Sequence, residues 1–185
     1  VSIVRFDQIH PVVSGNKLFK LHHFLQDHET GTTLVTFGGA YSNHLVATAF
    51  ACKEKNIPCI GIVRGEKPAS LSKTLTDCIN YGMQLKYFNR ALYDKKESPD
   101  FINELKKEYG NNCSIVPEGG YHPRGAEGAS LMMNAVSPTS THISCASGTA
   151  TTLAGLLLKK HSHQQVVAIP VLKGMHDFNE RLLYL

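Results

Sequence analysis

Hydrophobic and polar residues follow two alternating patterns along this chain, and together they predict a succession of strands and helices. Short runs rich in β-branched and aromatic residues are typical of strands. Between them, apolar residues recur every three or four positions, which is the spacing of one face of a helix. The most polar interval, 93–100, is expected to be an exposed loop. The predicted strands are 2–6, 33–37, 59–63, 84–88, 113–116, 142–146 and 166–171, and the predicted helices are 17–28, 42–55, 71–81, 101–109, 125–136, 151–160 and 177–185.

This alternation predicts βαβ units and therefore an α/β fold, with doubly wound, mostly parallel twisted sheets in a three-layer αβα arrangement. In such sheets, ligands bind at the carboxyl ends of the strands. Three turns rich in glycine or hydroxyl residues follow predicted strands, at 38–43, 118–128 and 147–152. We expect all three turns to face one crevice.

Composition and charge narrow the class of protein. The 185 residues are 42% hydrophobic and 18% charged, as in a globular domain with a core, and the net charge of +4 gives a mild preference for anionic ligands. No basic run indicates nucleic acid, no apolar run is long enough for a membrane span, and no signal peptide is recognisable. The five cysteines are scattered, as in a reducing cytoplasm, and the histidines lack partners at metal-ligand spacing. We expect a cytoplasmic protein with no metal site and with neither nucleic acid nor membrane as a partner.

The segment 14–21 (SGNKLFKL) places Lys17 at the start of a predicted helix. The helix dipole disfavours a cation at this end, which lowers the pKa of a lysine and exposes a nucleophilic amine. A solvated lysine in a first turn would have the same pattern, so the segment alone leaves both interpretations open.

Two further loops join a predicted strand to a predicted helix. The loop 147–152 offers backbone N–H groups, three threonines and a serine, which suits the phosphate monoester of a cofactor. No lysine follows it at the spacing of a nucleoside triphosphate loop. The loop 38–44 (GGAYSNH) presents polar groups suited to a substrate carboxylate. Simple capping of the two helices is the alternative in both places. The loop 117–128 has glycines that would let it bend around a planar ligand, or it is an ordinary connection.

A lysine at a helix start, a phosphate loop and a carboxylate loop around one crevice are the parts needed to attach a phosphorylated aldehyde cofactor to a protein. With its motifs 14–21, 38–44, 117–120 (PEGG) and 148–155 (GTATTLAG), the chain resembles the pyridoxal-phosphate enzymes of the tryptophan-synthase-β type, fold type II. Within them it is most similar to the 1-aminocyclopropane-1-carboxylate deaminase and D-cysteine desulfhydrase group. The order and separation of the motifs agree over nearly the whole chain.

The resemblance implies a role for each motif residue. Lys17 would bind the cofactor pyridoxal 5'-phosphate covalently and later move a proton, and Ser42 would be a nucleophile or stack on the cofactor ring. Ala150 and Thr151 stand where the family often has glycines, and His44 resembles the desulfhydrase version of its motif. The implied cofactor-binding residues are Asn16, Lys17, Lys20, Gly148, Thr149, Ala150, Thr151 and Thr152, and the implied substrate-binding residues are Ser42, Asn43, His44, Gly120 and Tyr121.

The resemblance also implies an activity and an organisation. The chain would be a deaminase or lyase acting on a small amino acid, with D-cysteine, the cyclopropane acid and D-serine all left open, and it would form a homodimer. Residues 1–32 and 131–185 would belong to a large cofactor domain of a partial fold type II architecture, and 33–130 to a small α/β domain. The family continues beyond the end of this chain, so a truncated member or a fragment is expected.

Three other functions are weighed against this hypothesis. A non-catalytic or remnant cofactor-binding protein of the same fold is the main alternative. A serine acyl-transferase is indicated by Ser-x-x-Lys patterns at 14–17 and 70–73 and by the segment 41–43 (YSN), which resembles its second motif. The Lys-Thr-Gly motif that should accompany them is missing, and the βα alternation does not suit that fold. A dinucleotide-binding unit is disfavoured because no Gly-x-Gly-x-x-Gly follows a predicted strand.

Overall fold

The computed structural model describes residues 1–111, 113–172 and 174–185. The chain divides into two compact units, which are described separately. The terminal unit consists of Val1–Phe24 and Gly119–Leu185, and the central unit of Leu25–Glu118. The domain limits expected from the sequence, 1–32 with 131–185 and 33–130, stay a prediction.

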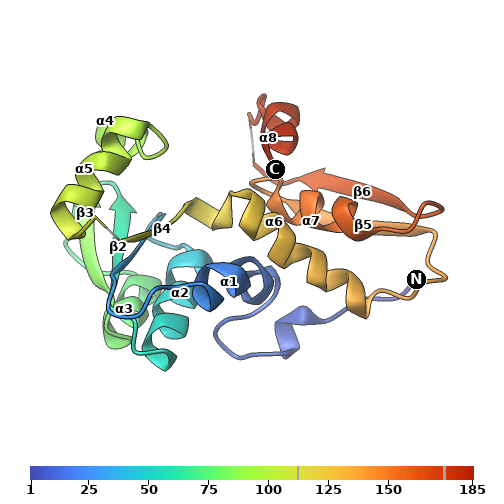
Figure 1. The fold of residues 1–185 in the computed structure, drawn as a ribbon, viewed down its shortest axis with the longest axis horizontal. Coiled ribbons are helices and arrows are strands. Elements are labelled where there is room, and N and C mark those ends of the chain that lie inside the picture. The colour runs from blue at the N-terminus through green and yellow to red at the C-terminus, as the bar shows by residue number, and fades with distance from the viewer. Residues whose placement is uncertain (112, 173) are drawn as a thin grey trace. The chain divides into compact units, whose positions relative to one another are not determined.

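The central unit is built on a parallel four-stranded sheet with the strand order β3-β2-β1-β4 (Figure 1). In the register, Leu34 of β1 lies opposite Cys59 of β2 and Ser114 of β4. The chain therefore adds strands on one side of β1 and then returns to its other side. The elements are β1 (Leu34–Gly38), α2 (Asn43–Glu54), β2 (Cys59–Arg64), α3 (Lys73–Asn80), β3 (Gln84–Phe88), α4 (Arg90–Tyr93), α5 (Pro99–Tyr109) and β4 (Ser114–Val116).

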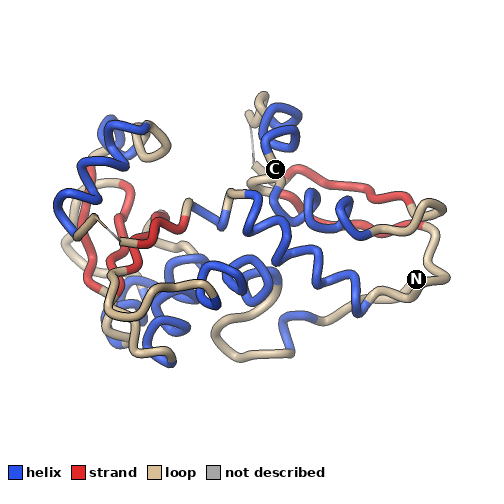
Figure 2. Tube along the Cα trace, in the orientation of Figure 1, coloured by secondary structure: helices blue, strands red, loops and turns tan. Residues whose placement is uncertain are grey.

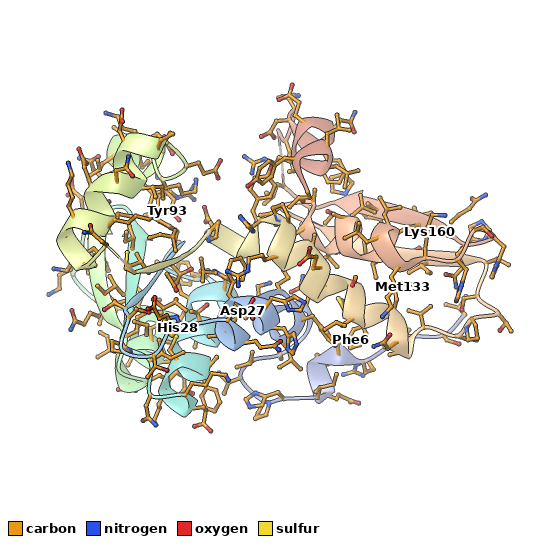
Figure 3. The ribbon with its side chains drawn as sticks, viewed as in Figure 1. Phe6, Asp27, His28, Tyr93, Met133 and Lys160 are labelled. Carbon is orange, nitrogen blue, oxygen red and sulfur yellow. The ribbon has the colours of Figure 1, made fainter. Side chains whose placement is uncertain are left out.

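Helices cover both faces of this sheet, which gives the expected three-layer arrangement in the central unit. All five residues of β1 are buried, because a strand between two helical layers has no solvent face. On one face, β1 and β2 pack against α4 and α5, where Tyr93 is 1% exposed (Figure 3). On the other face, a Cβ on Gly61 of β2 would lie 3.4 Å from the side chain of Leu45 in α2.

The terminal unit contains a two-stranded parallel sheet whose strands are joined by a helix (Figure 2). This βαβ unit follows from the alternation of apolar strands and an apolar helix in the sequence. The elements are a 3₁₀ turn (Phe6–Gln8), α1 (Asn16–Gln26), a 3₁₀ turn (Glu118–Gly120), α6 (Pro123–Ser130), a 3₁₀ helix (Leu131–Ala135), β5 (His142–Ser147), α7 (Thr151–Lys159), β6 (Gln165–Pro170) and α8 (Phe178–Tyr184). Phe6 and Met133, both labelled in Figure 3, belong to its hydrophobic core.

Glycines allow three helices of the terminal unit to pack at close range. A Cβ on Gly128 of α6 would overlap the carbonyl oxygen of Phe19 in α1. A Cβ on Gly155 of α7 would lie 2.5 Å from the carbonyl oxygen of Ala126 in α6. The backbones of α1 and α7 are therefore both held against α6, and the loops that open these two helices share one support.

Three sequence-based predictions of elements are wrong in part. The run 2–6 forms no strand: residues 2–5 are exposed, Phe6 opens a 3₁₀ turn, and Arg5 pairs with Asp7. The interval 93–100 is not simply an exposed loop, since it begins with the buried Tyr93 at the end of α4. The predicted helix 125–136 begins earlier and changes to a 3₁₀ helix after Ser130. None of the helices in the described ranges has the length and apolar character that a membrane crossing needs.

Gly128→Ala should destabilise the protein although it improves helix propensity. Propensity alone would stabilise α6 by about 1 kcal/mol. The added methyl group, however, meets backbone rather than a movable side chain, so we expect the free energy of unfolding to fall by about 2 kcal/mol or more. Urea unfolding measures it. Gly39→Ala is the control, because its Cβ would meet nothing within 4 Å. A Gly128→Ala variant as stable as the wild type would contradict the close packing.

Candidate functional site

The side chain of Asn16 links Lys17 to Thr152 in the first turn of α7. Gly15 adopts a positive φ of 61°, and α1 then begins at Asn16. The Nζ of Lys17 donates a hydrogen bond to Oδ1 of Asn16 at 2.7 Å. The Nδ2 of Asn16 donates in turn to Oγ1 of Thr152 at 2.9 Å. Residues 136 positions apart in the sequence thus bring the candidate nucleophile and the candidate phosphate loop together within the terminal unit.

Burial lowers the pKa of both lysines of α1. Desolvation lowers the pKa of Lys17 below its ordinary value of 10.5. Desolvation, with a smaller effect from the charge of Lys17, lowers the pKa of Lys20 to about 7. Lys20 is only 4% exposed. In the described ranges, neither amine forms an ion pair with a carboxylate. A buried cation without a counter-charge is costly, so this position suits an anionic ligand.

The loop 147–152 leaves the first amide groups of α7 without a side-chain cap. Ala150 occupies the N-cap position in the left-handed conformation, with φ 62°, and forms no side-chain hydrogen bond. The Oγ1 atoms of Thr149 and Thr151 lie 2.9 Å apart and bond each other. The first N–H groups of a helix have no intrahelical acceptor, and together with the dipole they attract an anion. The capping alternative raised by the sequence therefore does not hold for Ala150.

Two glycines at the end of the second 3₁₀ turn pack against the same parts of the unit. Gly119 and Gly120 have positive φ values of 66° and 72°. A Cβ on Gly119 would lie 3.1 Å from Thr149, and one on Gly120 would lie 3.2 Å from Cβ of Lys20. The glycines at 119 and 120 thus bring this turn against both the loop and the buried lysine. The next residue, Tyr121, contacts α8 instead, where its hydroxyl donates to the carbonyl of Arg181 at 3.3 Å.

In the central unit, the β1–α2 turn lies at the point where the strand order reverses. Because β2 and β4 flank β1 and the chain leaves β1 in the direction of β2, the carboxyl ends of β1 and β4 form the switch point of the sheet, where ligands bind in folds of this kind. Ser42 caps α2 by accepting a hydrogen bond from the N–H of Leu45 at 3.3 Å. A Cβ on Gly38 would lie 2.6 Å from Oγ of Ser42, so this turn needs a glycine there. Asn43 is exposed.

His44 points into the core of the central unit, and Thr36 fixes its ring. The ring is 3% exposed, and its Nε2 lies 2.9 Å from Oγ1 of Thr36. That hydroxyl donates its single proton to the carbonyl of Val116 at 2.9 Å. It can therefore only accept from the histidine, so Nε2 of His44 carries a proton. Sequence reasoning did not single out Thr36, although a hydroxyl inside a fully buried strand was a signal for a side-chain partner.

The described residues contain no group of three or more histidine, cysteine, aspartate or glutamate side chains that could hold a metal ion. The five cysteines are free thiols; four are buried and Cys145 is partly exposed. The chemistry available in the terminal unit is therefore that of two amines and a loop of amide and hydroxyl donors. These groups fit a phosphorylated aldehyde: an amine to bond the aldehyde, and a cation with uncapped N–H groups to bind the phosphate.

Comparisons with curated proteins point to the same group. The chain is 30% identical over 168 residues to a candidate 1-aminocyclopropane-1-carboxylate deaminase of Thermotoga maritima, covering 84% of this chain and 52% of that protein. A protein of Pyrococcus abyssi with the same name is 28% identical over 182 residues, 92% of this chain and 55% of the relative. A candidate mitochondrial D-cysteine desulfhydrase 2 of Oryza sativa subsp. japonica is 29% identical over 116 residues, 62% of this chain and 28% of the relative. No protein-family model matches.

Solved structures agree with these relatives. The crystal structure of an ACC deaminase homologue has a TM-score of 0.76 and 26% identity, and the match covers 95% of this chain and 57% of that one. A fungal L-serine ammonia-lyase from Rhizomucor miehei shares the fold, with a TM-score of 0.67 at 16% identity over 95% of this chain and 55% of that one. The resemblance expected from the motifs is confirmed: the chain is related to the 1-aminocyclopropane-1-carboxylate deaminase and D-cysteine desulfhydrase group of fold type II. It spans about half the length of the curated relatives it matches.

Lys20 should contribute a stability that rises with pH above neutrality. Below pH 7 the lysine is protonated in both folded and unfolded chains, and the full cost of the buried charge applies. As pH rises past about 7, the folded chain releases this proton while the unfolded chain keeps it, so the free energy of unfolding increases by up to about 1.4 kcal/mol per pH unit. Urea unfolding at several pH values from 7 to 8.5 measures the slope. The five thiols begin to titrate in the unfolded chain in this range and act in the opposite direction, so the Lys20 contribution is the difference between the wild type and a variant without this lysine.

Lys20→Met should flatten most of that slope, since it removes the titrating group. A smaller slope should remain from Lys17, whose pKa is lowered in the same direction. Lys107→Met, at an exposed position of α5, is the matched control and should keep the wild-type slope. Equal slopes in the wild type and Lys20→Met would show that Lys20 keeps its charge in the folded protein.

Proposed function

We propose that this chain, a relative of the 1-aminocyclopropane-1-carboxylate deaminase and D-cysteine desulfhydrase group, binds pyridoxal 5'-phosphate through Lys17 in its terminal unit. The observation that carries the proposal is the bonded series from Lys17 through Asn16 to Thr152, next to the unpaired Lys20. An amine with a lowered pKa has a larger neutral fraction at pH 7, and only the neutral form attacks an aldehyde. The lysine is thus prepared for a covalent bond while its neighbours are prepared for a phosphate.

Each group of the terminal unit has a role in this proposal. Lys20 and the amides and hydroxyls of 148–152 hold the phosphate, which supplies the counter-charge that Lys20 lacks. Asn16 orients the amine of Lys17 and would offer a hydrogen bond to a polar substituent on the cofactor ring. When bound, the cofactor would supply an electron sink for the substrate Cα. The amine of Lys17 would accept or return the proton at that carbon.

We further propose that the substrate is a small amino acid. Ser42 and Asn43 with the N-terminal amides of α2 hold its carboxylate, with Gly120 and Tyr121 as further contacts and Ser42 as the additional catalytic group. His44 supports this loop through Thr36. D-Cysteine and water would give pyruvate, ammonia and hydrogen sulfide, and the cyclopropane acid and water would give 2-oxobutanoate and ammonia. A non-catalytic cofactor-binding protein is the second candidate, because the bonded series from Lys17 to Thr152 supports cofactor binding without requiring turnover.

Two features of the working protein belong to the same proposal. We propose a homodimer, because enzymes of the group that the chain resembles are commonly dimeric. We propose a cytoplasmic location, supported by five cysteines that form no disulfide.

Borohydride labelling tests the assignment of Lys17. Incubation with pyridoxal 5'-phosphate should produce visible absorption, and reduction should then leave a pyridoxyl group on the peptide that contains Lys17. Lys17→Ala should lose both signals, because among residues 1–111, 113–172 and 174–185 no other amine lies in the bonded series with the loop. Lys107→Ala, an exposed lysine, should keep both and serves as the control.

The same experiment separates the two candidate functions. A label on Lys17 together with keto-acid release from D-cysteine or the cyclopropane acid supports the enzyme. A label on Lys17 without turnover of any small amino acid supports the binding protein. A label on another lysine, or none, would overturn the proposal.

A further inference from the structure

Ser147, the last residue of β5, has a buried hydroxyl without a partner. The residue is 2% exposed, and its Oγ has no hydrogen-bond partner among the described residues. Buried hydroxyl groups in folded proteins nearly always form hydrogen bonds, and an unsatisfied one costs on the order of 1–3 kcal/mol. A hydroxyl left in this condition at the start of a ligand loop indicates that its partner is the ligand.

The position of Ser147 places this hydroxyl on the side of the sheet that faces Lys20. Alternate residues of a strand share a face, so Ser147 lies on the same face of β5 as Cys145. Cys145 and Lys20 are close enough that each shifts the pKa of the other. The serine therefore lies on the face of β5 that carries Cys145, the residue near the buried lysine, and it directly precedes the loop that leads to the uncapped start of α7.

The other hydroxyl groups of the loop already have hydrogen-bond partners. Thr149 and Thr151 bond through their Oγ1 atoms at 2.9 Å, and Thr152 accepts a hydrogen bond from Asn16 at 2.9 Å. None of these three hydroxyl groups forms a hydrogen bond with Ser147. Two independent observations thus meet at one place: the first turn of a nine-residue helix without a side-chain cap, and a polar side chain that is buried and unpaired.

We propose that the Ser147 hydroxyl is a further ligand-binding group, which donates a hydrogen bond to the phosphate held by Lys20 and the loop 148–152. This inference rests on the proposed function, since it names a further contact to the same phosphate. The chemistry recognised is a phosphate monoester or free phosphate, and a ligand without phosphate gains nothing from it. A donor to a charged oxygen contributes more than a neutral hydrogen bond, so its loss should weaken binding by about 10- to 100-fold.

Ser147→Ala should separate binding from stability. The dissociation constant for pyridoxal 5'-phosphate, measured from its absorption, should rise about 10- to 100-fold. The cofactor-free variant should be as stable in urea as the wild type, or more stable, because no protein partner loses a bond. Ser147→Cys, which keeps the volume but weakens the donor, should show an intermediate loss of affinity. Ser144→Ala is the matched control, since this serine lies on the exposed face of the same strand.

Three ligands distinguish the possible sources of the effect. Pyridoxal, which lacks the phosphate, should bind equally to the wild type and to Ser147→Ala. If inorganic phosphate competes with the cofactor, that competition should weaken in the variant. Unchanged cofactor affinity in both Ser147 variants, or an equal loss for pyridoxal, would overturn the role of Ser147 while leaving the proposed function standing. A less stable cofactor-free Ser147→Ala would assign the hydroxyl a structural partner and would also overturn it. A wild type that binds no pyridoxal 5'-phosphate would end both proposals.

Discussion

A buried ammonium group needs a counter-charge, and Lys20 has none in the part of the chain that the structure describes. This is the constraint from which the rest of the terminal unit can be understood. A protein that only had to fold would be more stable with an apolar residue at this position, because an unpaired charge loses its hydration without compensation. The position is instead occupied by a lysine near a second lysine, in the same unit as a helix start without a cap. Each feature costs stability alone, and under the proposed function one bound anion would relieve all of them.

Such a site requires a fixed distance between the segments that open α1 and α7, and backbone packing fixes this distance. The glycines at 128 and 155 let α1 and α7 approach α6 with no side chain between them, so neither helix can slide without a backbone collision. The hydrogen bonds from Lys17 to Asn16 and on to Thr152 then connect the starts of the two helices directly. Rigid helices carry the groups that must not move, which is the arrangement that precise binding sites require.

The sequence predicts much of this, and its failures have physical causes. Strand and helix alternation predicts nearly every element of the central unit, because strands buried on both faces are strongly apolar. The run 2–6 looks like a strand by composition but finds no neighbouring strand, and pairing cannot be read from one segment. The buried position of Tyr93 was missed because the surrounding residues are polar and only one ring enters the core. The inward direction of His44 was missed because it depends on Thr36, which lies in β1 and outside the loop motif 38–44.

The loop before α7 shows why motif letters and backbone geometry should be treated separately. By the resemblance described above, Ala150 stands where the family often has glycine, and the loss of a glycine predicts a changed loop. The backbone nevertheless has a φ of 62° at this residue, a conformation that costs a non-glycine residue about 1–2 kcal/mol. A chain free to relax would leave this region. It stays there because Ala150 is buried and the adjoining helix is held by Gly155, so the packing of the unit imposes the geometry of a glycine on an alanine. The positive φ turns successive N–H groups toward one point, which is the property an anion-binding loop needs.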